Sequence, residues 1–571
     1  MNARWQWMGL LTILLMGFSA EDTLVIPKGY FDKPINGTIR LSGTFGELRP
    51  NHFHSGIDIK PTIKGAGQAV LAAAEGYVFR VKVQPGGYGN ALYLKHPNGY
   101  VTVYAHLQSF NPEIEEYIKN YQYQKKTFSV NLYPGKEKFV FQKGEEIAKL
   151  GNSGGSSGPH LHFEIRKGTK PMNPLLFDLP FEDYESPQMH ELKIYHLNDK
   201  KETIGTETFK LSARGNDYRT NSDTLTIGAW RVGLALKVYD RMTGVTNWNG
   251  IYKLSMLVND TMSYEFRMDD FGFDETRYIN AHLDYAEQVE KKSYFNRCFL
   301  LPGNKLSIYN QKPEGILPLY KNKPTKVTLI AEDINENKTS LTFFLKRGEV
   351  ENPPSRNFNY TIPYNQTKEI FLDNFKATFS ANTFYEDCYL SFNREGAPST
   401  SYYADLYQLG NYTTPVHKYF EIAIKPDGVI PENLKAKCFI AYCDKNQNIN
   451  NCGGKWSGEF LKTSVRALGE YSIQIDTVAP TIKNINLNPN MKGRTAFSFK
   501  ITDETPISGS ANGLNYSASI DGNWVLMKYD AKNDKITHSI EKDLEAGEHT
   551  FLLEVRDDRN NVSTFETTFT Y

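Results

Sequence analysis

The sequence predicts a mainly β protein built from several domains, and three observations support this. The chain has 571 residues, more than one hydrophobic core usually serves, so roughly two to four domains are expected. It contains 35 Tyr and 34 Phe, and aromatic side chains favour pleated, half-buried surfaces. Short strand-like runs separated by Gly, Asn and Pro recur from about residue 41 to the end of the sequence.

The first domain, expected over residues 21–184, has the pattern of an antiparallel β core with tight turns. Its strand-like runs are 68–72, 76–83, 91–94 and 101–104. One segment predicts a short helix at 114–124, because Asn111 can cap it, Pro112 suits the first helical position and Glu113 suits the first turn. This helix belongs to an insertion at about 108–139 that is expected to lie beside a cleft.

The remainder of the chain predicts three β-sandwich modules, near 185–350, 351–475 and 480–571, the last immunoglobulin-like. Several of their strands end in Asp/Asn-rich turns, at 333–337, 444–448 and 557–561. An EF-hand loop would also need glutamate at position twelve, counted from the first aspartate, where Phe344 and Lys455 stand. Ordinary turn chemistry therefore explains these segments better than an EF-hand. Asp521-Gly522 predicts a hairpin turn.

Charge and the N-terminal segment narrow the class of protein. The 65 basic and 65 acidic residues balance, so nothing indicates a nucleic-acid partner. Residues 1–20 resemble a signal peptide, with Arg4, an apolar run at 9–18 and small residues at Ser19 and Ala20. We therefore expect an exported protein with no membrane span after cleavage.

Five cysteines follow the expected signal peptide. An oxidising compartment allows one or two disulfides among them, with at least one thiol left over. They are Cys298, Cys388, Cys438, Cys443 and Cys452.

Polar residues able to bind a metal concentrate in the first domain, which holds six of the twelve histidines between 52 and 162. His54 and Asp58 would lie roughly 13 Å apart in an extended strand, but Gly56 allows a bend that brings them together. In the run Gly158-Pro-His-Leu-His-Phe-Glu164, His160 and His162 share one strand face, while the alternate residues turn to the core.

Other candidates surround these two segments. His106 follows the strand at 101–104, Tyr88 and Asn90 lie in a Gly-rich turn that could line a substrate groove, and Ser156 lies in a second Gly-rich loop. Three protein ligands with an open fourth position would make a hydrolytic zinc site, and a nearby histidine could move a proton. Spacing alone leaves open which histidines bind the metal, and His52 is a second-ranked candidate.

Three motifs follow one another over about residues 41–177: His-x-x-x-Asp, Tyr-Ala-His-Leu and Gly-Pro-His-Leu-His-Phe-Glu. In this order they resemble the lysostaphin/LytM-type zinc metallopeptidases. The resemblance implies an antiparallel β domain of the duplicated hybrid motif type and one zinc ion. His54, Asp58 and His162 would bind that zinc, and His106 and His160 would form the catalytic pair. The insertion at 108–139 departs from the family pattern.

The resemblance also implies a function. It predicts an endopeptidase that hydrolyses peptide cross-links of peptidoglycan, with a D,D bond as the expected target. A Gram-negative periplasm is favoured over the cell surface or secretion. Because some members of the family regulate other wall hydrolases, a non-enzymatic regulator is the main alternative, and a secreted protease for other proteins is a third. The C-terminal β modules are candidate contacts for envelope proteins.

Overall fold

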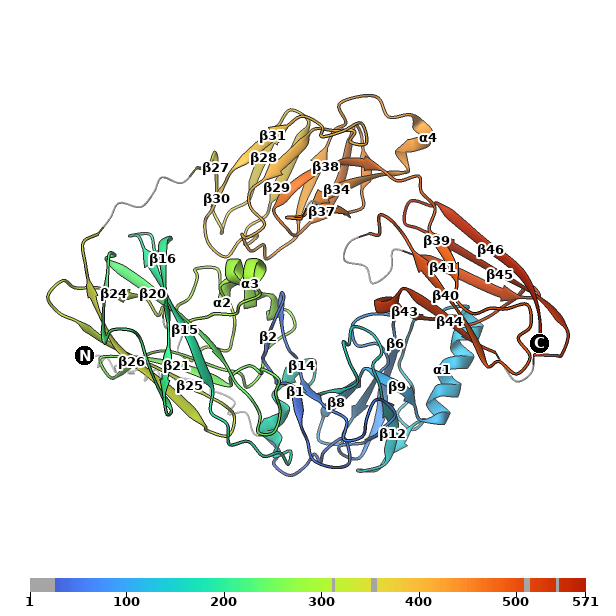
Figure 1. The fold of residues 1–571 in the computed structure, drawn as a ribbon, viewed down its shortest axis with the longest axis horizontal. Helices are drawn as coiled ribbons and strands as arrows, with labels where there is room; N and C mark the ends of the chain where they lie inside the picture. The colour runs from blue at the N-terminus through green and yellow to red at the C-terminus, as the bar shows by residue number, and fades with distance from the viewer. Residues whose placement is uncertain (1–25, 311–313, 351–356, 447, 508–513, 541–543) are drawn as a thin grey trace, which may run out of the picture.

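The computed structural model describes residues 26–310, 314–350, 357–446, 448–507, 514–540 and 544–571. Figure 1 shows these residues as β-rich units that follow one another around an arc, with the last unit returning to the first. The mainly β class is confirmed. The expected signal peptide at 1–20 lies outside the described residues. Within those residues, no helix has the length and apolar character needed to cross a bilayer.

The first unit contains one large antiparallel sheet, in the order β1-β4-β13-β8-β7-β6-β10, and a smaller sheet, β5-β12-β9. All four strand-like runs read from the sequence here are strands. The elements are β1 (Leu41–Gly43), β2 (Leu48–Arg49), β3 (His52–Phe53), β4 (Ile57–Ile59), β5 (Ala69–Leu71), β6 (Gly76–Val83), β7 (Ala91–Lys95), β8 (Tyr100–Ala105), β9 (Leu107–Phe110), α1 (Pro112–Lys125), β10 (Val130–Leu132), β11 (Val140–Phe141), β12 (Glu146–Leu150), β13 (Leu161–Lys167), β14 (Lys170–Met172) and the 3-10 helix η1 (Pro174–Phe177).

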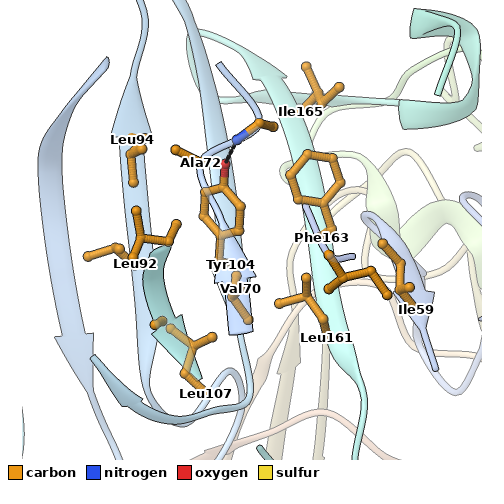
Figure 2. Close-up of a cluster of buried hydrophobic side chains, with 14 of the residues drawn as sticks. Ile59, Val70, Ala72, Leu92, Leu94, Tyr104, Leu107, Leu161, Phe163 and Ile165 are labelled. Carbon is orange, nitrogen blue, oxygen red and sulfur yellow. Dashed lines mark hydrogen bonds between the residues drawn. The ribbon is translucent and has the colours of Figure 1, made fainter. Parts of the chain in front are cut away.

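Strand β13 supplies the centre of the first hydrophobic core. Leu161, Phe163 and Ile165 are fully buried there, and Figure 2 shows them pointing to the same side of the strand, toward Tyr104. The hydroxyl of Tyr104 accepts a 2.8 Å hydrogen bond from the Ala73 amide. Each such apolar side chain contributes about 1.5–3 kcal/mol on burial. This packing fixes the strand, so the intervening residues must face the opposite side of the sheet.

The predicted insertion helix is present as α1, and the Asn111 side chain accepts from the Glu113 amide as its cap. The helix contacts the last unit of the chain instead of standing free. Tyr123 packs edge-on against Trp524 at 5.4 Å between ring centroids, and Phe128, just beyond the helix, packs against the core of the last unit. The insertion therefore docks the C-terminal unit beside the first one.

The second unit has two sheets, β16-β15-β20-β23 and β17-β18-β26-β25-β21-β22, that share one core. Two residues of the first unit, Phe45 and Phe53, belong to that core and pack against Phe271, so hydrophobic contacts cross the domain boundary expected near 184. The elements are β15 (Gln188–Leu197), β16 (Thr203–Lys210), β17 (Ser212–Arg214), β18 (Asp217–Arg219), β19 (Thr224–Ile227), β20 (Arg231–Tyr239), β21 (Lys253–Val258), β22 (Thr261–Arg267), η2 (Thr276–Tyr278), α2 (Ile279–His282), α3 (Tyr285–Lys291), β23 (Asn296–Arg297), β24 (Leu317–Pro318), β25 (Thr325–Glu332) and β26 (Lys338–Arg347).

The third unit also has two main sheets around one core, β28-β29-β33-β37-β36 and β31-β32-β38-β34-β35. Its elements are β27 (Tyr360–Ile362), β28 (Lys368–Leu372), β29 (Phe375–Phe379), β30 (Cys388–Leu390), β31 (Phe392–Glu395), β32 (Leu406–Leu409), β33 (Phe420–Ile424), α4 (Glu432–Lys435), β34 (Cys438–Cys443), β35 (Ile449–Asn451), β36 (Lys455–Ser457), β37 (Phe460–Val465) and β38 (Gly469–Ile475).

The fourth unit packs the sheet β39-β40-β44-β43 on the sheet β42-β41-β45-β46. Asp521 and Gly522 form the predicted hairpin turn, both with positive φ. The elements are β39 (Thr481–Asn484), β40 (Ala496–Thr502), β41 (Asn515–Ile520), β42 (Asn523–Trp524), β43 (Lys528–Asp530), η3 (Ala531–Asn533), β44 (Lys535–Ser539), β45 (Glu548–Arg556) and β46 (Val562–Thr570).

The one or two disulfides that the sequence allowed are not formed, because all five cysteines are free thiols. Four of them are buried, and Cys452 is partly buried. Burial raises the pKa of Cys388 and of Cys452 to about 12, so these thiols are protonated at neutral pH. They pack as small apolar side chains, which is what free buried cysteines commonly do.

Candidate metal centre

The register of the large sheet brings the predicted site residues together. Asp58 on β4 lies directly opposite His162 on β13, and His162 lies opposite Ala105 on β8. Residues opposite each other in an antiparallel pair have Cβ atoms about 4.5–5.5 Å apart. His106 follows Ala105 immediately, so residues far apart in sequence meet at one edge of the sheet. His54 joins them from the segment just before β4.

Three donor atoms of this group converge closely. The distance from His54 Nε2 to Asp58 Oδ1 is 3.1 Å, and His162 Nδ1 lies 3.0 Å from each of these two atoms. Ligands about 2.0–2.1 Å from a tetrahedral zinc ion stand about 3.3 Å apart. Two imidazole nitrogens and a carboxylate oxygen, the chemistry that zinc prefers, therefore already have nearly the right spacing.

Hydrogen bonds behind the histidines orient the two rings. His54 Nδ1 lies 2.8 Å from the Thr44 carbonyl oxygen and donates to it, which leaves the Nε2 lone pair facing the other donors. His162 is turned the other way, with Nε2 2.8 Å from Glu164 Oε1 and Nδ1 facing the site. Such carbonyl and carboxylate partners fix the tautomer of metal-binding histidines.

Glu164 is a supporting residue that reasoning from the sequence did not single out, although it ends the quoted motif. Its side chain is fully buried, and its Oε1 also accepts from the Tyr88 and Ser55 hydroxyls at 2.6 and 2.9 Å. Arg166 donates from Nε to the other oxygen at 2.5 Å. Alternation along β13 could have shown it, because Glu164 shares the face of His162.

Arg49 and Glu47 were also missed as members of the site. Arg49 Nη2 lies 2.6 Å from Asp58 Oδ2, which leaves Oδ1 for the histidines, and Glu47 is 3.5 Å from the same guanidinium nitrogen. Burial raises the pKa of Glu47 to about 7. The β2–β3 hairpin positions these side chains, and no sequence pattern predicted that it folds back onto the site.

These contacts and the burial of the site set the pKa values of the three donor residues when no ion is bound. Burial lowers the pKa of His54 to about 4. Burial opposes charge on His162 as well, but hydrogen bonds to Asp58 and Glu164 raise its pKa to about 9. Burial also opposes ionisation of Asp58, yet its histidine neighbours hold its pKa well below the usual range. At neutral pH a proton on His162 thus occupies the position that a metal needs.

Zinc affinity should therefore depend on pH. Because binding must displace the His162 proton below about pH 9, the apparent affinity is expected to rise about tenfold per pH unit between pH 6 and 8 and to flatten above pH 9. Competition with a chromogenic chelator measures this. Calorimetry in two buffers of different ionisation enthalpy should give about one proton released per zinc. A zinc affinity that does not change between pH 6 and 8 would contradict the expectation.

His106 and His160 lie beside the three donors, with ring centroids 4.8 Å apart. His106 Nδ1 donates to the Ser153 carbonyl at 2.9 Å, and His160 Nδ1 is 2.9 Å from the Gly158 carbonyl. Each ring thus keeps its Nε2 free of these backbone bonds, and His160 Nε2 lies 3.4 Å from Asp58 Oδ1. Burial lowers the pKa of His106 to about 3, so this ring is neutral at pH 7.

The backbone at His106 is unusual, because its φ is +59°. Left-handed backbone is uncommon for residues other than glycine, although His and Asn adopt it more readily than most. The main chain here is held by the bond from the His106 amide to the Tyr88 carbonyl at 2.9 Å. Strain of this kind concentrates at functional sites.

The groove candidates have different surroundings. The Tyr88 hydroxyl is committed to Glu164, and Ser156 is buried with its Oγ donating to the Gly158 carbonyl at 2.7 Å, beside His160. Asn90 lines a cavity of about 250 Å³ shared with the last unit. His52 is exposed, with Nδ1 2.9 Å from the Pro50 carbonyl, and does not join the three donors.

The last unit reaches the loop that precedes His160. Lys532 Nζ donates to the backbone carbonyls of Asn152 and Ser156, the latter at 3.3 Å. Figure 1 shows β43 and β44 of that unit beside the first one. The C-terminal unit therefore forms part of the surroundings of the candidate metal centre, which composition and motifs did not indicate.

Comparison with known proteins agrees with this geometry. Residues 52–174 match peptidase family M23, and this segment is an M23 peptidase domain. Residues 359–476 match the Zu5-like domain. The donors His54, Asp58 and His162 all fall within the M23 segment.

Curated relatives match over the same part of the chain. An uncharacterized metalloprotease of Haemophilus influenzae is 32% identical over 27% of this chain and 28% of its own length. The DD-carboxypeptidase/endopeptidase Mpg of Neisseria meningitidis serogroup B is 35% identical over 28% of this chain and 32% of its own. The murein hydrolase activator NlpD of Escherichia coli is 32% identical over 24% of this chain and 28% of its own length. The chain spans less than a third of the length of these relatives.

Proposed function

We propose that this protein is a zinc-dependent endopeptidase that hydrolyses peptide cross-links of bacterial peptidoglycan, at a D,D bond between stem peptides. One observation carries the proposal: two imidazole nitrogens and a carboxylate oxygen converge within about 3 Å, with two further histidines beside them. The M23 match and the relatives named DD-carboxypeptidase/endopeptidase support the substrate class.

In this proposal His54, Asp58 and His162 hold the zinc. A zinc ion held there would polarise the scissile carbonyl and lower the pKa of a bound water toward neutrality. Glu164 keeps His162 turned so that Nδ1 faces the site, and Arg49 holds the second oxygen of Asp58.

His106 and His160 are the catalytic pair in this proposal. Because each Nδ1 faces a backbone carbonyl, each Nε2 begins as a proton acceptor. One of them can take a proton from the attacking water, and the resulting imidazolium can donate it to the leaving amine or stabilise the oxyanion. Asp58 beside His160 stabilises the positive charge on that ring.

The second candidate is a non-enzymatic regulator of other wall hydrolases. The relative named murein hydrolase activator favours it, since it matches the same segment at similar identity. Both candidates place the protein outside the cytoplasmic membrane, in a periplasm or at the cell surface, with the C-terminal units open to envelope proteins. They differ in whether a peptide bond is cut.

Mass spectrometry of purified sacculi separates the two candidates. Sacculi incubated with the zinc-loaded chain should yield new uncross-linked muropeptides. His160→Ala should yield none above the level without enzyme. His52→Ala is the matched control and should match the wild type, because His52 is exposed and stands apart from the donors. Zinc binding without any new muropeptide from the wild type would favour the regulator.

A further inference from the structure

Three buried carboxylates meet at the junction between the first and second units. Asp183 lies in the segment before β15, Asp240 directly follows β20 and Asp333 directly follows β25. All three are at least nine-tenths buried, and each offers an oxygen within 4.8 Å of the others. Like charges at this distance repel strongly when they are removed from water.

A fourth side chain marks the same place independently. Asn249 is 2% exposed, yet neither its amide nitrogen nor its amide oxygen has a hydrogen-bond partner. It lines a small cavity of about 20 Å³ together with Asp183, Asp240 and Asp333. Oδ1 of Asp240 is buried without a partner as well. Buried polar groups are almost always paired, so these atoms indicate a missing polar partner, and the cavity has room for a single ion or water.

The electrostatics point to a cation as that partner. Burial and the neighbouring carboxylates Asp333 and Asp183 raise the pKa of Asp240 to about 8. Burial likewise raises the pKa of Asp333 to about 6. A divalent cation between the three carboxylates would offset the repulsion among them.

The arrangement recurs at the start of the fourth unit. Asp183 lies five residues before Gln188, the first residue of its unit's first strand, and Asp476 lies five residues before Thr481. Asp503 and Asp557 directly follow β40 and β45 and form the second triad with Asp476.

The hydrogen bonds of the two triads also correspond. Asn337 Nδ2 donates to the Asp183 carbonyl at 3.1 Å, and Asn561 Nδ2 donates to the Asp476 carbonyl at 3.1 Å. Oδ1 of Asp333 and Oδ1 of Asp557 each accept the backbone amides two and four residues along the chain. The chain thus builds the same carboxylate triad twice.

Turn chemistry alone does not account for this. Asp444 makes the same turn, accepting the Asn446 and Asn448 amides at 2.8 and 2.9 Å, but it is only partly buried and belongs to neither triad. One aspartate is therefore enough for the turn. The two extra carboxylates in each triad need a different explanation.

We propose that Asp183, Asp240, Asp333 and Asn249 form a structural Ca²⁺ site. Carboxylate and amide oxygens are the ligands that Ca²⁺ prefers, at about 2.3–2.6 Å, so two ligands on opposite sides of the ion stand about 4.8 Å apart. The site differs from an EF-hand because its ligands come from separate strand ends and not from one loop.

The site lies where it can tie the two units together. Gly250 follows Asn249 and exchanges two hydrogen bonds with Thr44, at 3.1 and 3.2 Å. The Thr44 carbonyl in turn holds His54 Nδ1. An ion bound at the junction would stiffen the segment that orients one of the proposed zinc ligands.

Calorimetric titration of CaCl₂ into the zinc-loaded full chain tests the proposal, together with Tm measured with and without Ca²⁺. Wild type should bind Ca²⁺ and gain several degrees in Tm at about 100 times Kd. Asp240→Asn should bind one Ca²⁺ fewer per chain and gain less in Tm. This variant should fold, because asparagine keeps the size of the side chain and removes one of three carboxylates that crowd together. Asp444→Asn, the matched control, should behave as wild type.

The proposal would be overturned if the wild type showed neither binding heat nor a Tm shift in millimolar Ca²⁺. It would also be overturned if Asp240→Asn bound as many Ca²⁺ ions per chain as the wild type. A full effect from Mg²⁺ alone would overturn the assignment to Ca²⁺.

Terbium emission gives a test on the wild type alone, because Tyr252 lines the same cavity and should sensitise bound Tb³⁺. Ca²⁺ should quench that emission by displacement, and emission that Ca²⁺ leaves unchanged would contradict a Ca²⁺ site.

Discussion

Replacing His160 by alanine, or His106 by asparagine, is expected to lower muropeptide release at least about a hundredfold while zinc stays bound. General acid and base groups typically contribute about 10²–10⁴ in rate, and neither ring belongs to the converging donor set. Asparagine is the better replacement at 106 because it tolerates the φ of +59° there. Alanine in that backbone conformation would add strain unrelated to catalysis.

The measurement pairs initial rates on a defined cross-linked muropeptide with zinc content after dialysis. His54→Ala should lose both activity and zinc, which separates ligands from catalytic groups. His52→Ala should lose neither. If the His160 or His106 variant retained more than about a tenth of wild-type activity, the assignment of that residue to the catalytic pair would be wrong.

The second large effect is expected for Glu164→Gln, which keeps the shape of the side chain and removes its charge. Glu164 holds His162 at 2.8 Å and Arg166 at 2.5 Å. Loss of such a partner behind a metal ligand typically costs about 10–100-fold in metal affinity. Arg166, with its side chain 11% exposed, would lose its ionic partner, and breaking a buried ion pair costs about 3–5 kcal/mol.

Zinc affinity by chelator competition and the free energy of unfolding by urea test this expectation. Glu146→Gln is the control, because Glu146 pairs with Lys149 on the surface, where an ion pair contributes about 0–1 kcal/mol. Affinity and stability should be unchanged in the control. Wild-type zinc affinity in Glu164→Gln would show that the carboxylate does not orient His162.

Much of the first unit could be predicted because its patterns are local. Alternation along 160–164 fixed which side chains enter the core and which share the opposite face, and β13 follows it. Asn111, Pro112 and Glu113 predicted the start of α1. Gly56 allowed the bend between His54 and Asp58, and no Cβ fits there, since one would lie 2.4 Å from the Phe163 carbonyl oxygen.

The features that could not be predicted arise from contacts between distant segments. Arg49 reaches Asp58 only because the β2–β3 hairpin folds back. The carboxylates near Asn249 come from three strand ends whose adjacency follows from the fold and not from spacing. The state of the five cysteines was open for a related reason, because their pairing depends on which of them the fold brings together, and the fold buries them as thiols.

Zinc-edge X-ray absorption on the purified, zinc-loaded chain, with metal content measured on the same sample, tests the metal centre most directly. We predict one zinc per chain bound by nitrogen and oxygen at about 2.0–2.1 Å, with the multiple scattering of two imidazoles. A chain that binds no zinc, or one whose zinc has sulfur ligands near 2.3 Å from cysteines such as Cys443 or Cys452, would contradict a centre formed by His54, Asp58 and His162.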